Sequence, residues 1–549
     1  MNKHVNAIVV GAGAGGGAAA KELAVAGLSV IILERGKWPI YDDLAFDELG
    51  SQRVQVLHAS YGPDWNGNPR VVKFPDGNKH VGRIAEDGMA NCVGAGTVSY
   101  GAMAWRFMPE DFRLKSTYGE VEGSSLDDWP ISYDELEPYY TKAEWEVGVS
   151  GDETNPFMGP RSKPYPMPAF EQNREGRILS ETCKRMGLHP FSIPMLRNSI
   201  AYNGRAACIR NHTCCGYACP VDAKNGSQNS VIPVAMKTGN CQVKTGCIAA
   251  EVTVDDRGRA TGVKYFDENN KLQTQTADIV VVACSAVETA RLLLNSKSKL
   301  HPNGAGNNND CVGRNLQSHA YVGASGFFDY DILDLTGPGA TMAICDFNHH
   351  NEGIIGGGLL ANEFFQMPYI FSRSHPWGAK WGKEHKDFQR DSYRRIGRLM
   401  GPIQEIPMFD SRVTVDDEVK DFWGIPVAAL SGHRNQLDVA SGRFLAAQAE
   451  KIMKEAGAVR TWKWSPGGVG NSPSCGSHQA GTCRMGNDPK TSVVNAHCQV
   501  HEIDNLFVAG GSTLVTNGGF NPVLTIMATS FRTGEYIAKN FNSIKKSSL

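Results

Sequence analysis

The sequence predicts an α/β fold in which two separate regions each contain a β-sheet. Near the start, the apolar run Ala7–Val10 is followed by a glycine-rich turn, an alanine-rich helix and a second apolar run, Val30–Leu33. Together these form a βαβ unit of about thirty residues. From about residue 320 to 460 the composition changes to short β-like pieces and glycine-rich turns, which indicates a second, largely sheet-based region.

Further elements follow from the spacing of apolar residues along the chain. Apolar residues at helical spacing predict helices, and short apolar runs bounded by turn residues predict strands. The predicted helices are Tyr133–Val147, Ala286–Asn295, Gln436–Glu455 with Gly457 as its C-terminal cap, and a turn into a helix from Asn521 to Lys539. The predicted strands are Ile279–Ala283 and Leu506–Ala509.

Composition excludes several classes of protein. The 549 residues are 41% hydrophobic and 20% charged, which supports a large buried core and excludes wholesale disorder. The net charge of −2 provides no basic field for nucleic acid. We expect no transmembrane span, because no run of eighteen apolar residues occurs. We also expect no signal peptide of the chain's own, and therefore a cytoplasmic protein unless a partner exports it.

The glycine-rich turn has the pattern of a Rossmann-like dinucleotide site. Gly11 permits the tight turn, Gly13 lets a pyrophosphate approach the backbone, and Gly16 lets helix and strand pack closely. Glu34 ends the second strand, where its carboxylate can accept hydrogen bonds from a ribose diol, and Arg35 follows it. Both FAD and NAD fit this pattern, so the choice between them must come from elsewhere in the chain.

Four later segments carry a family resemblance. They are VGAGTVSYG with AWRF (93–101 and 104–107), ACSAVETARLL (283–293), VGRNLQSH (312–319) and GFNPVLT (519–525). In this order they resemble the flavin and active-site segments of the glucose–methanol–choline (GMC) oxidoreductases. Residues 104–119 and 129–140 are most similar to the catalytic subunits of bacterial FAD-dependent glucose, gluconate and glucoside dehydrogenases.

The resemblance implies a bound FAD and a division into domains. Residues 1–155, 225–325 and 460–549 would form a discontinuous FAD-binding domain, with a cysteine-containing insertion at 156–224 and a substrate-binding domain at 326–459. Beyond the glycine turn, Glu34 and Arg35, the implied cofactor-binding residues are Gly94, Gly96, Thr97, Ala102, Ile248, Gly510, Asn521 and Pro522.

Two residues are candidates for catalysis. A flavin enzyme that oxidises an alcohol needs a base for the hydroxyl proton, and histidine suits this task because its pKa lies near working pH. His478, in SHQAGTCRMG (477–486), matches the family segment that holds the catalytic histidine, and Asn521 matches the second active-site position. Its amide can donate to the substrate oxygen. His319 and His501 are weaker candidates and are expected to be structural.

Four of the fourteen cysteines crowd into CIRNHTCCGYACP (208–220). Cys208, Cys215 and Cys219, the last followed by proline, suit an iron–sulfur cluster, and relatives of the glucose-dehydrogenase type carry a [3Fe–4S] cluster in such a loop. The first interval departs from the family pattern, so Cys214 is an alternative third ligand. A disulfide, inert thiols or zinc are the other possibilities; zinc fits least, because four ligands at finger spacing are missing.

The predicted function is therefore an FAD-dependent dehydrogenase that oxidises a hydroxyl of a sugar or glucoside to a carbonyl by hydride transfer to flavin N5. Electrons would pass to an acceptor other than O₂, such as a quinone, a dye, a cytochrome or a small partner subunit whose export signal carries the chain to the periplasm. Glucose C1 and glucoside C3 are both candidate positions, and the absence of a haem or membrane segment favours C3. The alternatives are a pyranose or C-glycoside oxidase, an NAD-dependent dehydrogenase argued from the glycine turn alone, and a non-enzymatic scaffold.

Overall fold

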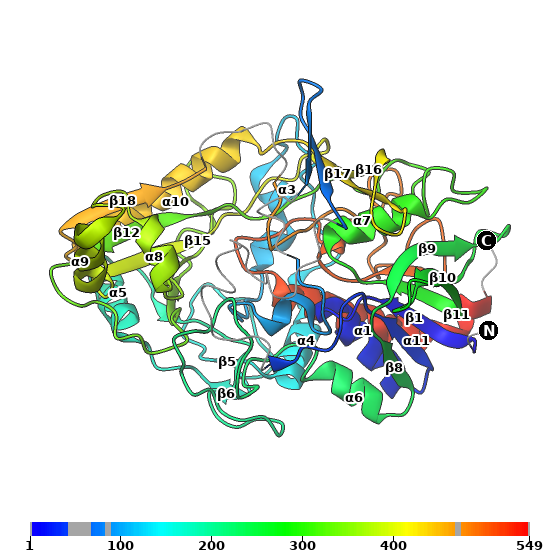
Figure 1. The fold of residues 1–549 in the computed structure, drawn as a ribbon, viewed down its shortest axis with the longest axis horizontal. Helices are drawn as coiled ribbons and strands as arrows, with labels where there is room; N and C mark the ends of the chain where they lie inside the picture. Colours follow the sequence, from blue (N-terminus) through cyan, green and yellow to red (C-terminus); the bar gives the residue numbers. More distant parts are fainter. Residues whose placement is uncertain (1–2, 42–66, 83–88, 467–473, 547–549) are drawn as a thin grey trace.

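The computed structural model describes residues 3–41, 67–82, 89–466 and 474–546. The two larger sheets lie at opposite ends of the long axis, with the connecting segments between them (Figure 1). The beginning and end of the described chain meet at one end of the molecule. There His4 Nε2 and Lys545 Nζ both contact the carboxylate of Asp278, at 3.1 and 3.2 Å.

The first sheet has seven strands in the order β8-β2-β1-β11-β10-β9, and β19 also pairs with β11. Its strands are β1 (Val5–Val10), β2 (Val30–Leu33), β8 (Cys241–Lys244), β9 (Ile248–Val254), β10 (Ala260–Phe266), β11 (Leu272–Val282) and β19 (Leu506–Val508). The predicted βαβ unit is confirmed, because β1 and β2 pair in parallel and α1 (Ala14–Val25) connects them.

The strand predicted at Ile279–Ala283 is longer than expected. β11 begins at Leu272, and its first half pairs antiparallel with β10. Its second half pairs in parallel with β1 and β19. The first half alternates exposed and buried residues, whereas Val280, Val281 and Val282 are all buried. A parallel strand is covered on both faces and therefore appears in the sequence as a continuous apolar run. For this reason only the second, parallel half of β11 was predicted from the sequence.

Helices cover both faces of the parallel strands. Ala7 and Val9 of β1 pack in one core cluster with α1 and α11 (Val523–Lys546). Ile8 and Val10 point to the other face and share a cluster with α7 (Ala286–Asn295). The period of two along a strand produces this division. Because α1 follows β1 through the glycine turn, its N-terminus lies at the carboxyl ends of the parallel strands, where ligands bind in open α/β sheets.

The second sheet has six strands in the order β18-β12-β15-β14-β13-β7. Its strands are β7 (Phe191–Ser192), β12 (Tyr321–Phe327), β13 (Met342–Ile344), β14 (Leu360–Asn362), β15 (Ile396–Pro402) and β18 (Arg460–Trp464). The helix α10 (Gln436–Glu455) has the predicted bounds, and Gly457 follows it with a φ of 94°, as a C-terminal glycine does. Leu445 and Ile452 of α10 pack on Val322 and Leu399 of this sheet.

A four-stranded sheet lies beside α7, in the order β16-β17-β3-β4, and β5 pairs with β6. These strands are β3 (Arg70–Lys73), β4 (Lys79–Gly82), β5 (Ser150–Gly151), β6 (Met167–Pro168), β16 (Arg412–Lys420) and β17 (Pro426–Ser431). The remaining α-helices are α3 (Leu114–Tyr118), α4 (Tyr133–Ala143), α5 (Arg174–Arg185), α6 (Val231–Lys237), α8 (Pro368–Ser374) and α9 (Gly382–Ser392). None of the helices in the described part of the chain has both the length and the hydropathy that a membrane span requires.

Candidate active site

The glycine turn between β1 and α1 can be built only with glycine at two positions. Gly11 has a φ of 108°, and a Cβ there would lie 2.5 Å from the carbonyl oxygen of Ala283. A Cβ on Gly16 would lie 2.0 Å from the carbonyl oxygen of Gly11, so helix and strand pack as closely as the pattern predicts. Gly13 caps α1 without a side chain, which leaves the first N–H groups of the helix open to a ligand.

Glu34 lies directly after β2 and holds the turn in place. Its two carboxylate oxygens accept hydrogen bonds from the backbone N–H groups of Ala12 and Gly36, each at 2.8 Å. Burial raises the pKa of Glu34, and these backbone donors oppose the rise. Each oxygen keeps a second lone pair, and Glu34 lines the adjoining cavity, so the carboxylate can also accept from a ligand hydroxyl.

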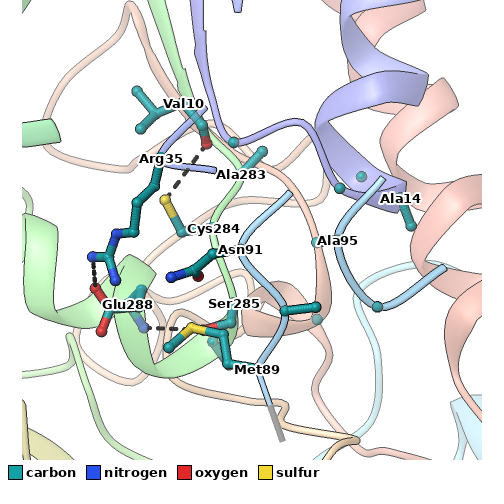
Figure 2. A pocket seen from close by; sticks show the side chains of 18 of the residues that line it. Val10, Ala14, Arg35, Met89, Asn91, Ala95, Ala283, Cys284, Ser285 and Glu288 are labelled. Carbon is teal, nitrogen blue, oxygen red and sulfur yellow. Dashed lines mark hydrogen bonds and ion pairs between the residues drawn. The ribbon is translucent and has the colours of Figure 1, made fainter. Parts of the chain in front are cut away.

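Arg35 closes the rim of this cavity by pairing with the first turn of α7. Its Nη2 lies 2.9 Å from Oε2 of Glu288, as Figure 2 shows. Arg70 and Arg291 approach the same carboxylate at 2.6 and 3.2 Å. Burial alone would raise the pKa of Glu288, but the three arginines hold it well below its usual range. Glu288 is therefore ionised, and it joins three segments around the cavity.

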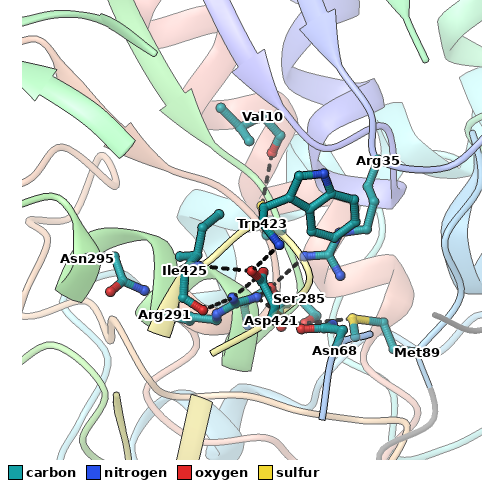
Figure 3. Close-up of polar contacts among 12 residues, drawn as sticks. Val10, Arg35, Asn68, Met89, Ser285, Arg291, Asn295, Asp421, Trp423 and Ile425 are labelled. Atoms are coloured by element: carbon teal, nitrogen blue, oxygen red, sulfur yellow. Dashed lines mark hydrogen bonds and ion pairs between the residues drawn. The ribbon is translucent and has the colours of Figure 1, made fainter. Parts of the chain in front are cut away.

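The network continues from Arg291 of α7 to the turn between β16 and β17 (Figure 3). Arg291 Nη2 lies 2.7 Å from Oδ2 of Asp421, and both groups are buried. The other oxygen of Asp421 accepts from the backbone N–H groups of Trp423 and Ile425, each at 2.9 Å. Arg291 also donates to Asn68 Oδ1 at 3.2 Å. This buried pair holds the four-stranded sheet against α7.

Two cavities extend from the glycine turn, one of about 250 Å³ and one of about 490 Å³. Both are lined by Ala14, Gly96, Ser477 and Ile526, so they adjoin. Of the predicted cofactor-binding residues, the smaller is lined by Gly11, Gly13, Glu34, Arg35, Gly96 and Gly510, and the larger by Gly94, Gly96, Thr97, Ala102, Asn521 and Pro522. Gly16 lies at the helix–strand contact and lines neither cavity, and nor does Ile248, whose neighbours Cys247 and Ala249 line the smaller.

The larger cavity brings together two segments that are far apart in the chain. Gln317 and Ala480 form an antiparallel bridge between them. Gly481 has a φ of 89°, and a Cβ there would lie 2.1 Å from the carbonyl oxygen of Asn315. This close pairing sets His319 and His478 side by side in the cavity wall.

The hydrogen bonds of His319 assign the proton positions on both imidazoles. Nε2 of His319 faces the carbonyl oxygens of Gly518 and Asn517 at 2.8 and 3.2 Å, so it carries a proton and donates. In the neutral ring Nδ1 is then an acceptor, and Nδ1–H of His478 donates to it at 3.0 Å. Nε2 of His478 is therefore unprotonated and free to accept a proton.

Burial keeps both imidazoles neutral. It lowers the pKa of His319, although the Glu405 carboxylate and the Gly518 carbonyl oppose this. Burial, reinforced by His319, lowers the pKa of His478 to about 3. A doubly protonated His319 would have no acceptor for the His478 proton, so these directions agree with the assignment from geometry.

Asn521 lies two residues before the start of α11 and faces His478. Trp105 Nε1 can only donate, and it lies 3.1 Å from one end of the Asn521 amide, which is therefore the carbonyl oxygen. The amide nitrogen donates to Tyr321 Oη at 2.7 Å and lies 3.3 Å from His478 Nε2. The structure thus brings both predicted catalytic residues to one point, with an acceptor nitrogen and a donor amide side by side.

Sequence reasoning missed several residues of this cavity. His319, which was expected to be structural, lines the cavity and contacts His478 directly. Tyr321, Glu363 and Arg398 also line the cavity. The histidine that ends the VGRNLQSH segment was a usable signal. The other three lie in or beside strands of the second sheet, where no local pattern distinguishes a cavity residue from a surface one.

The cysteine loop does not form a metal site in the structure. Among the described residues, no group of three or more histidine, cysteine or acidic side chains is close enough to hold an ion, and no disulfide joins any of the fourteen cysteines. The structure therefore does not show the predicted [3Fe–4S] cluster, and the loop contains no disulfide.

Comparison with known proteins identifies the family. The family model for GMC oxidoreductases matches residues 124–321, and its C-terminal counterpart matches residues 407–530. The chain belongs to the GMC oxidoreductase family. It is therefore a flavoprotein oxidoreductase that acts on the hydroxyl groups of alcohols or sugars.

Individual proteins that are similar to this chain over nearly its whole length are also dehydrogenases and oxidases. The chain is 31% identical to 2-methyl-1,2-propanediol dehydrogenase of Mycolicibacterium austroafricanum, over 98% of this chain and 96% of that one. It is 28% identical to the fructose dehydrogenase large subunit of Gluconobacter japonicus, over 96% and 97%. Formate oxidase of Aspergillus oryzae has the same fold, with a TM-score of 0.65, 15% identity and 99% of each chain covered.

The residues present fit FAD. The glycine turn leaves no room for a Cβ at Gly11, and the open N–H groups of α1 suit a pyrophosphate. The two adjoining cavities provide an elongated site that runs from Glu34 to the His478–Asn521 pair. FAD is thus the cofactor of this oxidoreductase, which decides between the two dinucleotides that the glycine turn alone left open.

Proposed function

We propose that the protein is an FAD-dependent dehydrogenase that oxidises a ring hydroxyl of a sugar or glucoside to a carbonyl. The observation that carries the proposal is the His478–Asn521 pair, which faces a cavity of about 490 Å³. This cavity adjoins the nucleotide cradle, by which we mean the smaller cavity lined by Gly11, Gly13 and Glu34. A cavity of this size accommodates a small ligand. The fructose dehydrogenase relative supports a carbohydrate as substrate.

The proposed roles follow from the hydrogen bonds. His478 Nε2 takes the hydroxyl proton, because its proton is on Nδ1 and its imidazole is neutral. Asn521 Nδ2 donates to the substrate oxygen and orients it, while Trp105 holds the amide the right way round. FAD, when bound, supplies the acceptor for the hydrogen and two electrons that leave the carbinol carbon.

The cofactor-binding roles of the predicted residues and the domain division are part of this proposal. The smaller cavity would hold the nucleotide between Gly11, Glu34 and Arg35. The FAD-binding domain would comprise residues 1–155, 225–325 and 460–549, which include the ranges outside the described residues. The substrate-binding domain, 326–459, would supply Glu363, Arg398 and Met400 of the larger cavity, whereas Tyr321 at the start of β12 lies in the predicted FAD-binding range.

Replacement of the base tests the proposal. We expect His478→Ala to lose at least about 10²-fold in turnover with a dye acceptor, which is the usual contribution of a positioned base, while flavin content stays that of the wild type. Flavin absorbance and dye reduction are measured on the same preparation. His501→Ala is the matched control, because His501 bonds Ser492 and lines neither cavity. Retention of more than a tenth of the activity by His478→Ala would remove His478 from this role.

The attacked carbon and the acceptor are determined in the same assay. A panel of free sugars, glucosides and sugar acids, with identification of the product, distinguishes a lactone formed at C1 from a ketone formed at C3. Because some GMC relatives are named oxidases, peroxide formed in air is compared with dye reduction. Faster turnover with O₂ than with the dye would favour the oxidase.

The iron–sulfur cluster, the partner and the compartment stay predictions from the sequence. Iron and acid-labile sulfide in freshly purified protein test the cluster, and their absence would end that prediction. Co-purification of a small subunit or a cytochrome with the full chain tests the partner, and fractionation of the host cell tests the compartment.

A further inference from the structure

A charged pair lies in the wall of the larger cavity that the second sheet provides. Arg398 lies in β15, and Glu363 directly follows β14. β14 and β15 are antiparallel, with Asn362 opposite Leu399, so the next position along the register sets Glu363 beside Arg398. Both residues line the cavity that contains His478 and Asn521.

The pleat of the sheet explains why these side chains face the cavity. Arg398 and Met400 are two residues apart in β15, so they point to the same face, and both line the cavity. Leu399, between them, points to the opposite face and packs in the core with α10. Tyr321, at the start of β12, also lines the cavity and accepts from Asn521. One sheet face thus carries both the support of the catalytic pair and the charged pair.

The two charged groups do not neutralise each other by direct contact. Among the described residues, no carboxylate oxygen lies within 4.0 Å of the Arg398 guanidinium, which contacts Met400 Sδ and faces the Trp464 ring. The Glu363 carboxylate accepts from the backbone N–H of Phe364 at 3.3 Å. Burial raises the pKa of Glu363 to about 7 and lowers that of Arg398, so both charges are costly here. Each retains hydrogen-bonding capacity toward the cavity.

We propose that Glu363 and Arg398 bind hydroxyl groups of a neutral carbohydrate and select against sugar acids and amino sugars. This inference rests on the proposed function. A hydroxyl group can donate to the carboxylate and accept from the guanidinium at once, which neither a carboxylate nor an ammonium group can do. A sugar acid is repelled by Glu363 while it is attracted by Arg398, and for an amino sugar the two effects are reversed. Neither charged ligand therefore gains enough attraction to offset the cost of moving its own charge out of water. The pair therefore matches a neutral polyhydroxylated ring and sets specificity without taking part in the chemical step.

Variants of opposite charge test this, with substrates that share one sugar ring and a free anomeric hydroxyl but carry different charges. At pH 7.5 we compare glucose, glucuronic acid and glucosamine with a dye acceptor. Glu363→Gln is expected to raise the KM for glucose about tenfold with kcat within twofold, and to raise the acid-to-neutral ratio of kcat/KM at least tenfold. Arg398→Met is expected to raise the same KM and instead to raise the amine-to-neutral ratio.

Glu175→Gln is the matched control. Glu175 is a buried carboxyl near the same arginine, and its carboxylate accepts a hydrogen bond from the backbone N–H of Arg398. Unlike Glu363, it does not line the larger cavity. It loses one charge as Glu363→Gln does, so it is expected to leave both ratios unchanged. The proposal would be overturned if Glu175→Gln changed the two ratios as much as Glu363→Gln does. It would also be overturned if Glu363→Gln and Arg398→Met both raised the same one of the two ratios.

The wild-type enzyme provides a second measurement if a variant fails to fold. Its kcat/KM for glucose must exceed those for glucuronic acid and glucosamine at least tenfold, and equal values would overturn the inference. Flavin-loaded wild-type enzyme that oxidises 2-methyl-1,2-propanediol but no carbohydrate would overturn the proposed function together with this inference. Oxidation of carbohydrates with unchanged ratios in the variants would overturn the inference alone.

Discussion

At the scale of single residues, the decisive feature is the direction of one proton on His478. Two backbone carbonyl oxygens, of Gly518 and Asn517, require His319 to donate from Nε2. This leaves His319 Nδ1 to accept from His478, so the second nitrogen of His478 is free. In an enzyme that needs a base, the tautomer matters as much as the position of the ring. His319 is thus a positioning residue for the proposed base.

Two substitutions of His319 distinguish the contribution of its hydrogen bonds to activity from the contribution of its volume. Glutamine can accept from His478 and donate to Gly518, whereas methionine fills similar space and does neither. We expect His319→Met to lose about 10²-fold in kcat and His319→Gln to retain most of it, with full flavin content in both. Rates of flavin reduction by substrate measure this. Equal activity of the two variants would contradict the positioning role.

The pH dependence of the reaction should report the lowered pKa of His478. A base must be unprotonated, so activity is present above the folded-state pKa and is lost as pH falls through it. An ordinary histidine with a pKa of about 6.5 would be about 90% protonated at pH 5.5. Burial lowers the pKa of His478 to about 3, so it stays neutral there.

We therefore expect kcat at saturating substrate to change less than about twofold between pH 7.5 and 5.5. Stopped-flow measurement of flavin reduction checks this. Glu363, beside Arg398 and near Tyr321 and Cys215, titrates in the same range, so the profile is repeated in Glu363→Gln. A tenfold fall in both enzymes would show an ordinary histidine pKa.

At the scale of elements, α7 connects the nucleotide cradle to the four-stranded sheet. Glu288 in its first turn pairs with Arg35 at the end of β2, and Arg291 one turn later pairs with Asp421. The two contacts lie on one face of the helix because residues three apart are neighbours there. The turn between β16 and β17 is thus tied, through α7, to the rim of the smaller cavity (Figure 3).

Removal of one partner of the buried Arg291–Asp421 pair should loosen this connection. Asp421→Asn keeps an oxygen for the backbone N–H groups of Trp423 and Ile425 but loses the ion pair. We expect about 3 kcal/mol of destabilisation and faster release of FAD on heating, because a buried charge is left partly unpaired. Flavin fluorescence during a thermal ramp measures the release.

The control for this prediction is Asp387→Asn, which breaks the Lys383–Asp387 pair on the surface of α9. An exposed pair four residues apart on a helix contributes only about 0.3–0.5 kcal/mol. We therefore expect a negligible change in the release temperature. Equal effects of the two variants would contradict the stabilising role of the Arg291–Asp421 pair.

At the scale of the whole molecule, the site forms where the two larger sheets face a common cavity. The nucleotide cradle comes from the strands and glycine turn of the first sheet, and Glu363, Arg398 and Tyr321 come from the second. His478 and Asn521 lie in the C-terminal part of the chain, between these contributions. Under the proposed function, substrate selectivity can vary in the second sheet without any change in the first sheet's nucleotide site.

The sequence by itself predicted the βαβ unit, and its resemblance to the GMC oxidoreductases predicted FAD and the proposed catalytic pair. The βαβ unit follows from local patterns: a glycine is required where backbone approaches backbone, and an apolar run marks a buried parallel strand. The helix Gln436–Glu455 was predicted with its observed bounds for the same reason, because its 3.6-residue period is a property of the segment alone.

Only the tertiary structure decided the rest. The tautomer of His478 depends on carbonyl oxygens about forty residues away in the chain, and the Glu363–Arg398 pair depends on the register of two strands. The four crowded cysteines suggested a cluster by spacing, yet their side chains do not converge. Contacts between distant segments are set by how whole elements pack, and no local pattern encodes them.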